Sequence, residues 1–157
     1  MTPKVLLLCI GVLYCAAAYG ASNATSDFLT APIDREQLAR KLVDFSRTPI
    51  NIQDMHCWAQ RLEHKELVRA GADMEKPLQI REIALAVLEA ATGEAFSVVK
   101  SGRATPVKEI VMCRIGNTPW RFHIADLTEG DYESVARNVE FWIAGYEAAL
   151  KKHKKRR

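Results

Sequence analysis

The sequence lacks the short motifs that identify common enzymes. It contains no glycine-rich phosphate loop, no Ser-centred nucleophile elbow and no dinucleotide-binding fingerprint. Its histidines and cysteines include neither a C-x-x-C pair nor an H-x₃-H pair, so no metal site is predicted. Internal repeats and low-complexity linkers are also missing. These absences favour a non-enzymatic protein with no cofactor, and they indicate no particular activity.

Long hydrophobic runs are lacking except at the N-terminus. Lys4 precedes an apolar run from Val5 to Ala18, and a small residue, Gly20, follows shortly after. This pattern predicts a secretory signal peptide over residues 1–20, cleaved after Gly20, and therefore a secreted, extracellular protein. A transmembrane helix needs about 20 apolar residues. An uncleaved anchor is therefore the less favoured alternative, and no transmembrane segment is expected after cleavage.

Cysteine is scarce in the predicted mature chain, which retains only Cys57 and Cys113. An even number of cysteines in a compartment that permits disulfides predicts that these two pair. The bridge would close a long loop, for which the chain-entropy estimate is about 4 kcal/mol of stabilisation. Two buried thiols without a bridge are the alternative.

The composition predicts one domain with a short segment on either side. A chain of 157 residues, 48% of them hydrophobic, has room for a single core, which we place at residues 33–150. Residues 21–32 form a flexible leader, in which Asn23 begins an N-glycosylation motif. Residues 151–157 form a basic tail with six cationic side chains: Lys151, Lys152, Lys154, Lys155, Arg156 and Arg157.

The basic tail is the strongest functional feature of the sequence. The formal net charge of the whole chain is only +3, so the chain without its tail is net negative. Clustered fixed charges attract polyanions such as glycosaminoglycans or anionic membranes, with an affinity that falls as salt rises. No aromatic side chains interleave with the charges, so specific nucleic-acid recognition is not predicted. A disordered solubilising tail, or an end trimmed by a carboxypeptidase, is the alternative.

Hydrophobic periodicity predicts three helices in the first part of the domain. The first runs from a capping box at Asp34 to about Thr48. The second is expected from about Ile52 to Arg69, although its apolar pattern weakens near His64. The third, from Ile80 to Thr92, has the clearest pattern and should be the most buried.

The pattern then changes from helical periodicity to alternation. A short strand is expected at residues 96–98, followed by a hairpin within Val107–Leu127 that turns at Gly116-Asn117. A capped helix then runs from Thr128 to Leu150. Together these elements predict an α+β fold. It consists of three N-terminal helices, a small antiparallel sheet of about three strands, and a long C-terminal helix packed on the sheet.

Two short motifs resemble those of known families. Cys57-Trp58-Ala59 is similar to the Cys-Trp pair that opens a helix in papain-like proteases, which implies a small hydrolase with a thiol nucleophile. The Cys-Gly-Ser that precedes the pair in those proteases is missing. Pro119-Trp120 is similar to the Pro-Trp hairpin of cystatins, which implies a protease inhibitor, but their Gln-x-Val-x-Gly motif is missing. The sequence therefore assigns the chain to no family.

We predict from these observations a secreted, non-enzymatic binding protein. Its partner would be an unknown protein or an anionic surface, contacted by the basic tail. One alternative is a protease inhibitor that acts through the hairpin at residues 116–120, with Asn117 and Trp120 as candidate partner-binding residues. Another is a host-defence protein that uses its tail on anionic membranes, and a third is a carrier of apolar ligands.

Overall fold

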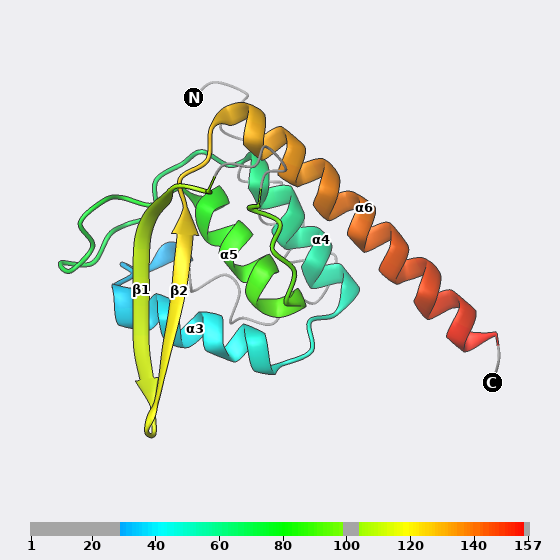
Figure 1. Cartoon of the computed structure of the whole chain (residues 1–157), viewed down its shortest axis with the longest axis horizontal. Coiled ribbons are helices and arrows are strands. Elements are labelled where there is room, and N and C mark those ends of the chain that lie inside the picture. The colour runs from blue at the N-terminus through cyan, green and yellow to red at the C-terminus, as the bar shows by residue number, and fades with distance from the viewer. Residues whose placement is uncertain (1–28, 99–103, 156–157) are drawn as a thin grey trace.

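The computed structural model describes residues 29–98 and 104–155 and shows an α+β fold (Figure 1). Within these residues, four α-helices accompany one antiparallel sheet of two strands. The predicted signal peptide, Asn23, Arg156 and Arg157 lie outside them. The elements in chain order are α3 (Arg35–Arg47), α4 (Ile52–Gln60), the 3₁₀-helix η1 (Arg61–Glu63), α5 (Ile80–Thr92), β1 (Val107–Ile115), β2 (Thr118–Ala125) and α6 (Glu129–Lys154).

Helix α5 is the centre of the fold. Every residue from Arg81 to Leu88 is buried, more than in any other described helix, which confirms the prediction for this segment. Helices α3 and α4, η1 and strand β2 all pack against it. Its first turn is capped by Glu82, whose Oε2 accepts a hydrogen bond of 2.7 Å from Gln79 N. Its last turn ends at Gly93, whose φ of 74° is left-handed and favours glycine.

The sheet and α6 lie on opposite sides of the central helices (Figure 1). Helix α3 packs on β1 and α5 packs on β2, whereas α6 packs on α4 and η1. The prediction that the last helix covers the sheet is therefore wrong. Because α3 and α5 already cover one face of the sheet, the apolar stripe of α6 is buried elsewhere, around Val135, Val139 and Ile143.

The predicted hairpin is confirmed, but the strand expected before it is not present. Strands β1 and β2 pair antiparallel, with Ile115 opposite Thr118. Gly116 turns the chain with a positive φ of 59°. Phe96 lies in a turn, and its ring meets that of Trp142 edge-on at 6.4 Å between centroids. The alternation around Phe96 therefore reflects packing against α6, and residues 99–103 lie outside the described part.

The second predicted helix is shorter than expected. Helix α4 ends at Gln60 and η1 at Glu63, and the chain to α5 then makes only isolated β-bridges. Gly71 lies so close to Asp34 that an added Cβ would be 2.9 Å from the Asp34 Cβ. This glycine therefore allows a close crossing of two chain segments.

The Glu89 carboxyl lies near the end of α5, and its burial should make the stability of the protein depend on pH. Burial is the main cause that raises its pKa, although its Oε1 accepts a hydrogen bond of 2.6 Å from Ser97 N. The folded state therefore binds this proton more tightly than the unfolded state. The free energy of unfolding should fall as pH rises from the ordinary pKa of 4.5 through the raised pKa.

We therefore expect Glu89→Gln, which keeps the acceptor oxygen and removes the charge, to be more stable than the wild type at neutral pH. Urea unfolding should show this gain at neutral pH, and the gain should disappear below pH 4.5, where Glu89 is protonated in both states. Glu94→Gln, at an exposed position, serves as the control and should change little at either pH. An equal gain in stability at both pH values would show that the gain does not come from removing a buried charge.

Candidate functional site

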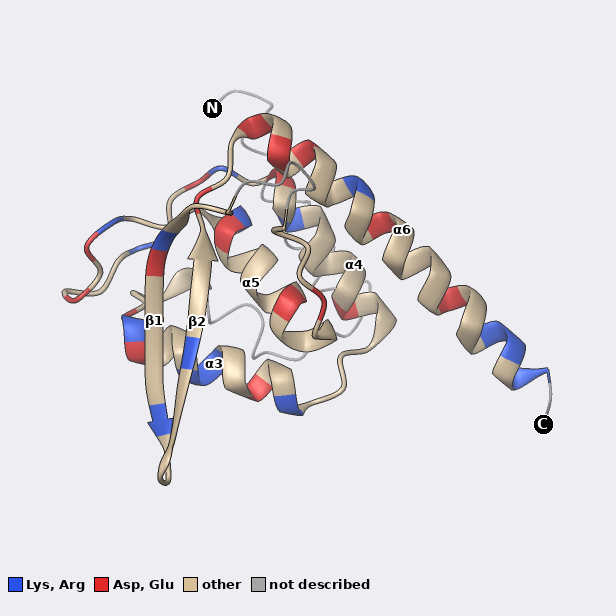
Figure 2. Ribbon diagram, in the orientation of Figure 1, with Lys and Arg blue, Asp and Glu red and all other residues tan. Residues whose placement is uncertain are grey.

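The last helix continues into residues 151–155, the described part of the basic tail. Helix α6 extends past residue 150 and includes Lys151, Lys152 and Lys154, and Lys155 is its C-terminal cap residue. All four side chains are exposed. Figure 2 shows them together at the end of α6, away from the rest of the protein. Positive charge is favourable there because the helix dipole places its negative end at the C-terminus.

The C-terminal half of α6 also exposes apolar side chains. Val139 and Ile143 are buried, but Tyr146 is 38% exposed and Leu150 is 40% exposed. The apolar stripe of α6 is therefore covered only in its first part, because the end of α6 extends beyond the rest of the fold (Figure 1). Phe141, which was not singled out from the sequence, is 84% exposed. This half of the helix thus combines cations with uncovered apolar surface.

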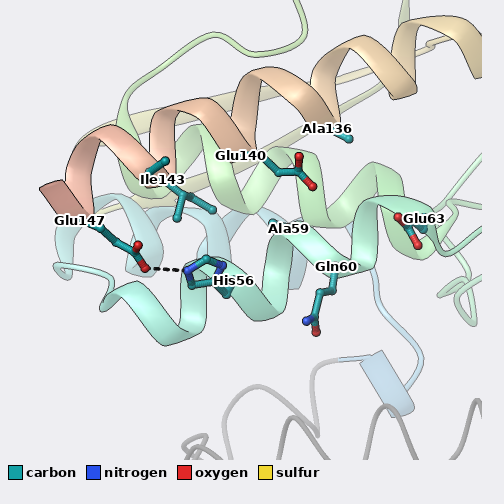
Figure 3. Close-up of a pocket in the computed structure, with 9 residues that line it drawn as sticks. His56, Ala59, Gln60, Glu63, Ala136, Glu140, Ile143 and Glu147 are labelled. Carbon is teal, nitrogen blue, oxygen red and sulfur yellow. Dashed lines mark hydrogen bonds and ion pairs between the residues drawn. The ribbon is translucent and has the colours of Figure 1, made fainter.

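A groove of about 290 Å³ lies between α4 and α6 (Figure 3). It is near the lower limit of about 300 Å³ for small-molecule sites, so it suits side chains or a small ligand. Figure 3 shows His56 pointing across it to Glu147, with 2.9 Å between His56 Nε2 and Glu147 Oε1. Its lining from α4 and η1 is His56, Ala59, Gln60 and Glu63, and from α6 it is Ala136, Glu140, Ile143, Ala144 and Glu147.

The groove is acidic. The hydrogen bond from His56 is the main cause that lowers the pKa of Glu147. Glu63 and Glu140 line the groove and form no ion pair within the described residues. The sequence did not single out this site, because its two walls come from separate helices. The only local signal was the seven-residue spacing of Glu140 and Glu147, which places both on one side of a helix.

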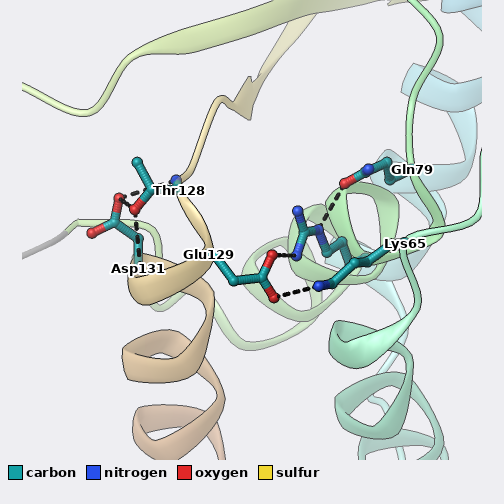
Figure 4. A network of polar contacts seen from close by, with 6 residues as sticks. Lys65, Gln79, Thr128, Glu129 and Asp131 are labelled. Carbon is teal, nitrogen blue, oxygen red and sulfur yellow. Dashed lines mark hydrogen bonds and ion pairs between the residues drawn. The ribbon is translucent and has the colours of Figure 1, made fainter.

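A polar network joins the start of α6 to the start of α5 (Figure 4). Glu129 pairs with Lys65 at 2.8 Å and with Arg81 at 3.0 Å, and these contacts lower the pKa of Glu129. The Arg81 guanidinium also lies 4.1 Å from the centre of the Tyr132 ring. Burial raises the pKa of the Tyr132 hydroxyl above its ordinary value of 10.0. The partners of this network are all within the protein, which indicates a structural role.

The disulfide predicted between Cys57 and Cys113 is not present in the structure. Both thiols are buried. Cys113 lies on β1, which packs on α3, whereas Cys57 lies on α4, which packs on α5 and α6. Burial is the main cause that raises the pKa of the Cys113 thiol. The even cysteine count could not show that the two residues belong to different layers of the fold.

The two candidate partner-binding residues of the hairpin occupy different environments. Asn117 is exposed in the turn, where the hairpin extends past α3 (Figure 1). Trp120 is half-buried, with its ring stacked on Phe122 at 6.3 Å and beneath the Arg47 guanidinium at 5.2 Å. Asn117 is thus open to solvent, whereas the Trp120 ring is partly covered by its neighbours.

The described residues show neither a metal-binding cluster nor a membrane-spanning helix. In residues 29–98 and 104–155, no group of three or more His, Cys, Asp or Glu side chains could hold a metal ion. Over the same ranges, no helix has both the length and the hydropathy needed to cross a bilayer.

Comparison with known proteins finds no relative. No protein-family model matches the chain, and neither the curated proteins nor the solved structures include a match. The function must therefore be argued from the charges and surfaces of this chain itself.

Proposed function

We propose that this chain is a secreted, non-enzymatic binding protein that contacts polyanions, such as glycosaminoglycans or anionic membranes, through the end of α6. The observation that supports this proposal is the set of exposed cations at the end of α6, namely Lys151, Lys152 and Lys154 in its last turn and Lys155 at its C-cap. The proposal includes export, with removal of residues 1–20.

The helical setting strengthens the electrostatic argument. A helix holds its lysines at regular spacing. The backbone that carries them therefore does not lose the conformational freedom that the backbone of a disordered tail loses on binding. The last turn is free of Asp and Glu, whereas carboxylates occur along the rest of α6 (Figure 2). A polyanion can therefore approach the end of α6 without meeting like charge on the same turn.

The test replaces all four lysines with glutamine, which keeps the helix and removes the charges. We expect the variant to lose most of its retention on heparin and on vesicles containing anionic lipid at low salt, because the attraction is electrostatic and screened by salt. Intact mass of the exported protein would show at the same time whether residues 1–20 are removed.

The matched control removes four exposed cations elsewhere by changing Lys41, Lys76, Arg114 and Arg121 to glutamine. This control has the same net charge as the test variant and should retain most of the binding. If both variants lost retention equally, binding would follow net charge alone and the end of α6 would have no special role.

A further inference from the structure

We propose that two copies of this chain pair through α6 in an antiparallel arrangement, so that the basic end of each helix covers the acidic groove of the other copy. This inference goes beyond the proposed function, because it assigns the lysines a partner within a second copy of the same chain. It rests on charge complementarity between the exposed lysines at the end of α6 and two groove carboxylates, Glu63 and Glu140, that form no ion pair within the described residues.

The lysines at the end of α6 are too far along the helix to pair with Glu140 of their own chain. Glu63 and Glu140 face the groove without an ion pair in the described ranges. Lys151 follows Glu140 by eleven residues, which places it about 16 Å farther along the same straight helix. A lysine side chain does not span that distance. Lys151 helps to lower the pKa of Glu147, one turn before it, but it does not reach Glu140 of its own chain, whereas a lysine of a second copy can.

The size of the groove favours side chains over a whole helix. A volume of about 290 Å³ is too small to hold a helix, but it can take the ends of lysine side chains from a helix lying above it. Small residues at Ala59, Ala136 and Ala144 leave this room along the lining. The cations should therefore come from a helix that presents lysines along one face.

The end of α6 in a second copy has the required geometry. A two-fold axis that passes between residues 145 and 146 of both helices places Lys151 of the second copy level with Glu140. The same axis places Lys155 of the second copy level with Ala136, on the groove lining that also includes Glu63. Lys151 and Lys155 are four residues apart and so project from the same side of their helix. The arrangement is isologous, because each copy contributes the same groove and the same lysines.

The experiment measures the mass of the protein by light scattering and by sedimentation equilibrium at low salt, after expression of the full chain. We expect a dimer for the wild type. Glu140→Lys and Lys151→Glu should each raise the dimer dissociation constant by at least about tenfold, because each places like charges opposite one another twice in the symmetric pair. The double variant Glu140→Lys/Lys151→Glu restores opposite charges and should recover the dimer.

Glu94→Lys is the matched control, since it makes the same charge change at an exposed position outside α6. It should leave the dimer intact. A wild type that remains monomeric up to its solubility limit would overturn the proposal, and so would single variants that dimerise like the wild type. A double variant no better than the single variants would also overturn it.

The same variants separate this inference from the proposed function. Glu140→Lys adds positive charge, so it should retain or increase binding to heparin while it breaks the dimer. Loss of the dimer with intact heparin retention would show that the two activities are independent. A stable dimer without heparin retention would contradict only the proposed function.

Discussion

Replacing Trp58 with alanine should lower the free energy of unfolding by about 4 kcal/mol. Trp58 is fully buried in α4, and its ring meets Phe45 of α3 edge-on with 5.7 Å between the centroids. The Arg61 guanidinium lies 4.4 Å from the Trp58 ring centre. Alanine would remove the contacts of the indole with both neighbours and leave a cavity between two helices that also pack on α5.

Urea unfolding followed by circular dichroism measures this loss. Trp58→Phe keeps an aromatic ring against Phe45 and should cost less than half as much. It also keeps the test valid if Trp58→Ala does not fold. Met112→Ala, at a position 59% exposed on β1, should change stability by less than about 0.5 kcal/mol. Similar losses for Trp58→Ala and Met112→Ala would show that Trp58 is not a packed core residue.

Replacing Lys108 with methionine should lower the free energy of unfolding by about 3 kcal/mol. Lys108 Nζ lies 2.7 Å and 2.9 Å from the two carboxylate oxygens of Glu82. The Lys108 side chain is 17% exposed and that of Glu82 only 5%. Removal of the ammonium group leaves a buried carboxylate without its counter-charge. Because Glu82 still accepts the hydrogen bond from Gln79 N, we expect the lower end of the usual range for broken buried pairs.

Two comparisons isolate the cost of the buried charge. Lys65→Met breaks the pair with Glu129, in which both side chains are 57% exposed, and should lower stability far less than Lys108→Met, because water screens an exposed pair. The double variant Glu82→Gln/Lys108→Met replaces the lone carboxylate with a neutral amide and should recover part of the loss. If Lys108→Met lowered the free energy of unfolding no more than Lys65→Met, then the burial of Glu82 would not make the loss of its counter-charge more costly.

The helix starts could be predicted from the sequence because capping is local. Asp34 Oδ1 accepts from Gln37 N at 2.7 Å, as the capping box predicted. Thr128 Oγ1 accepts from Asp131 N at 3.3 Å in the same way. Each of these contacts joins residues only three positions apart. The hairpin was equally predictable, since alternation and the Gly116-Asn117 turn specify both its strands and its register.

Contacts between distant segments were less predictable. An amphipathic pattern shows which face of a helix is apolar, but it does not name the element that covers that face. For this reason the pairing of α6 with α4, and the acidic groove between them, were missed. The alternation at Phe96 was misread as a strand, although it marks a contact with Trp142.

The sequence by itself determined the local features of this protein, namely the helix caps, the hairpin and the charge contrast between the chain and its basic end. Each depends on neighbouring residues or on composition. Only the tertiary structure decided that α6 packs on α4, that Cys57 and Cys113 lie in different layers, and that Glu63 and Glu140 share one groove. These relations join residues far apart in the chain. They depend on how the apolar faces of all the helices and strands are buried against one another. The sequence of a single segment does not specify that arrangement.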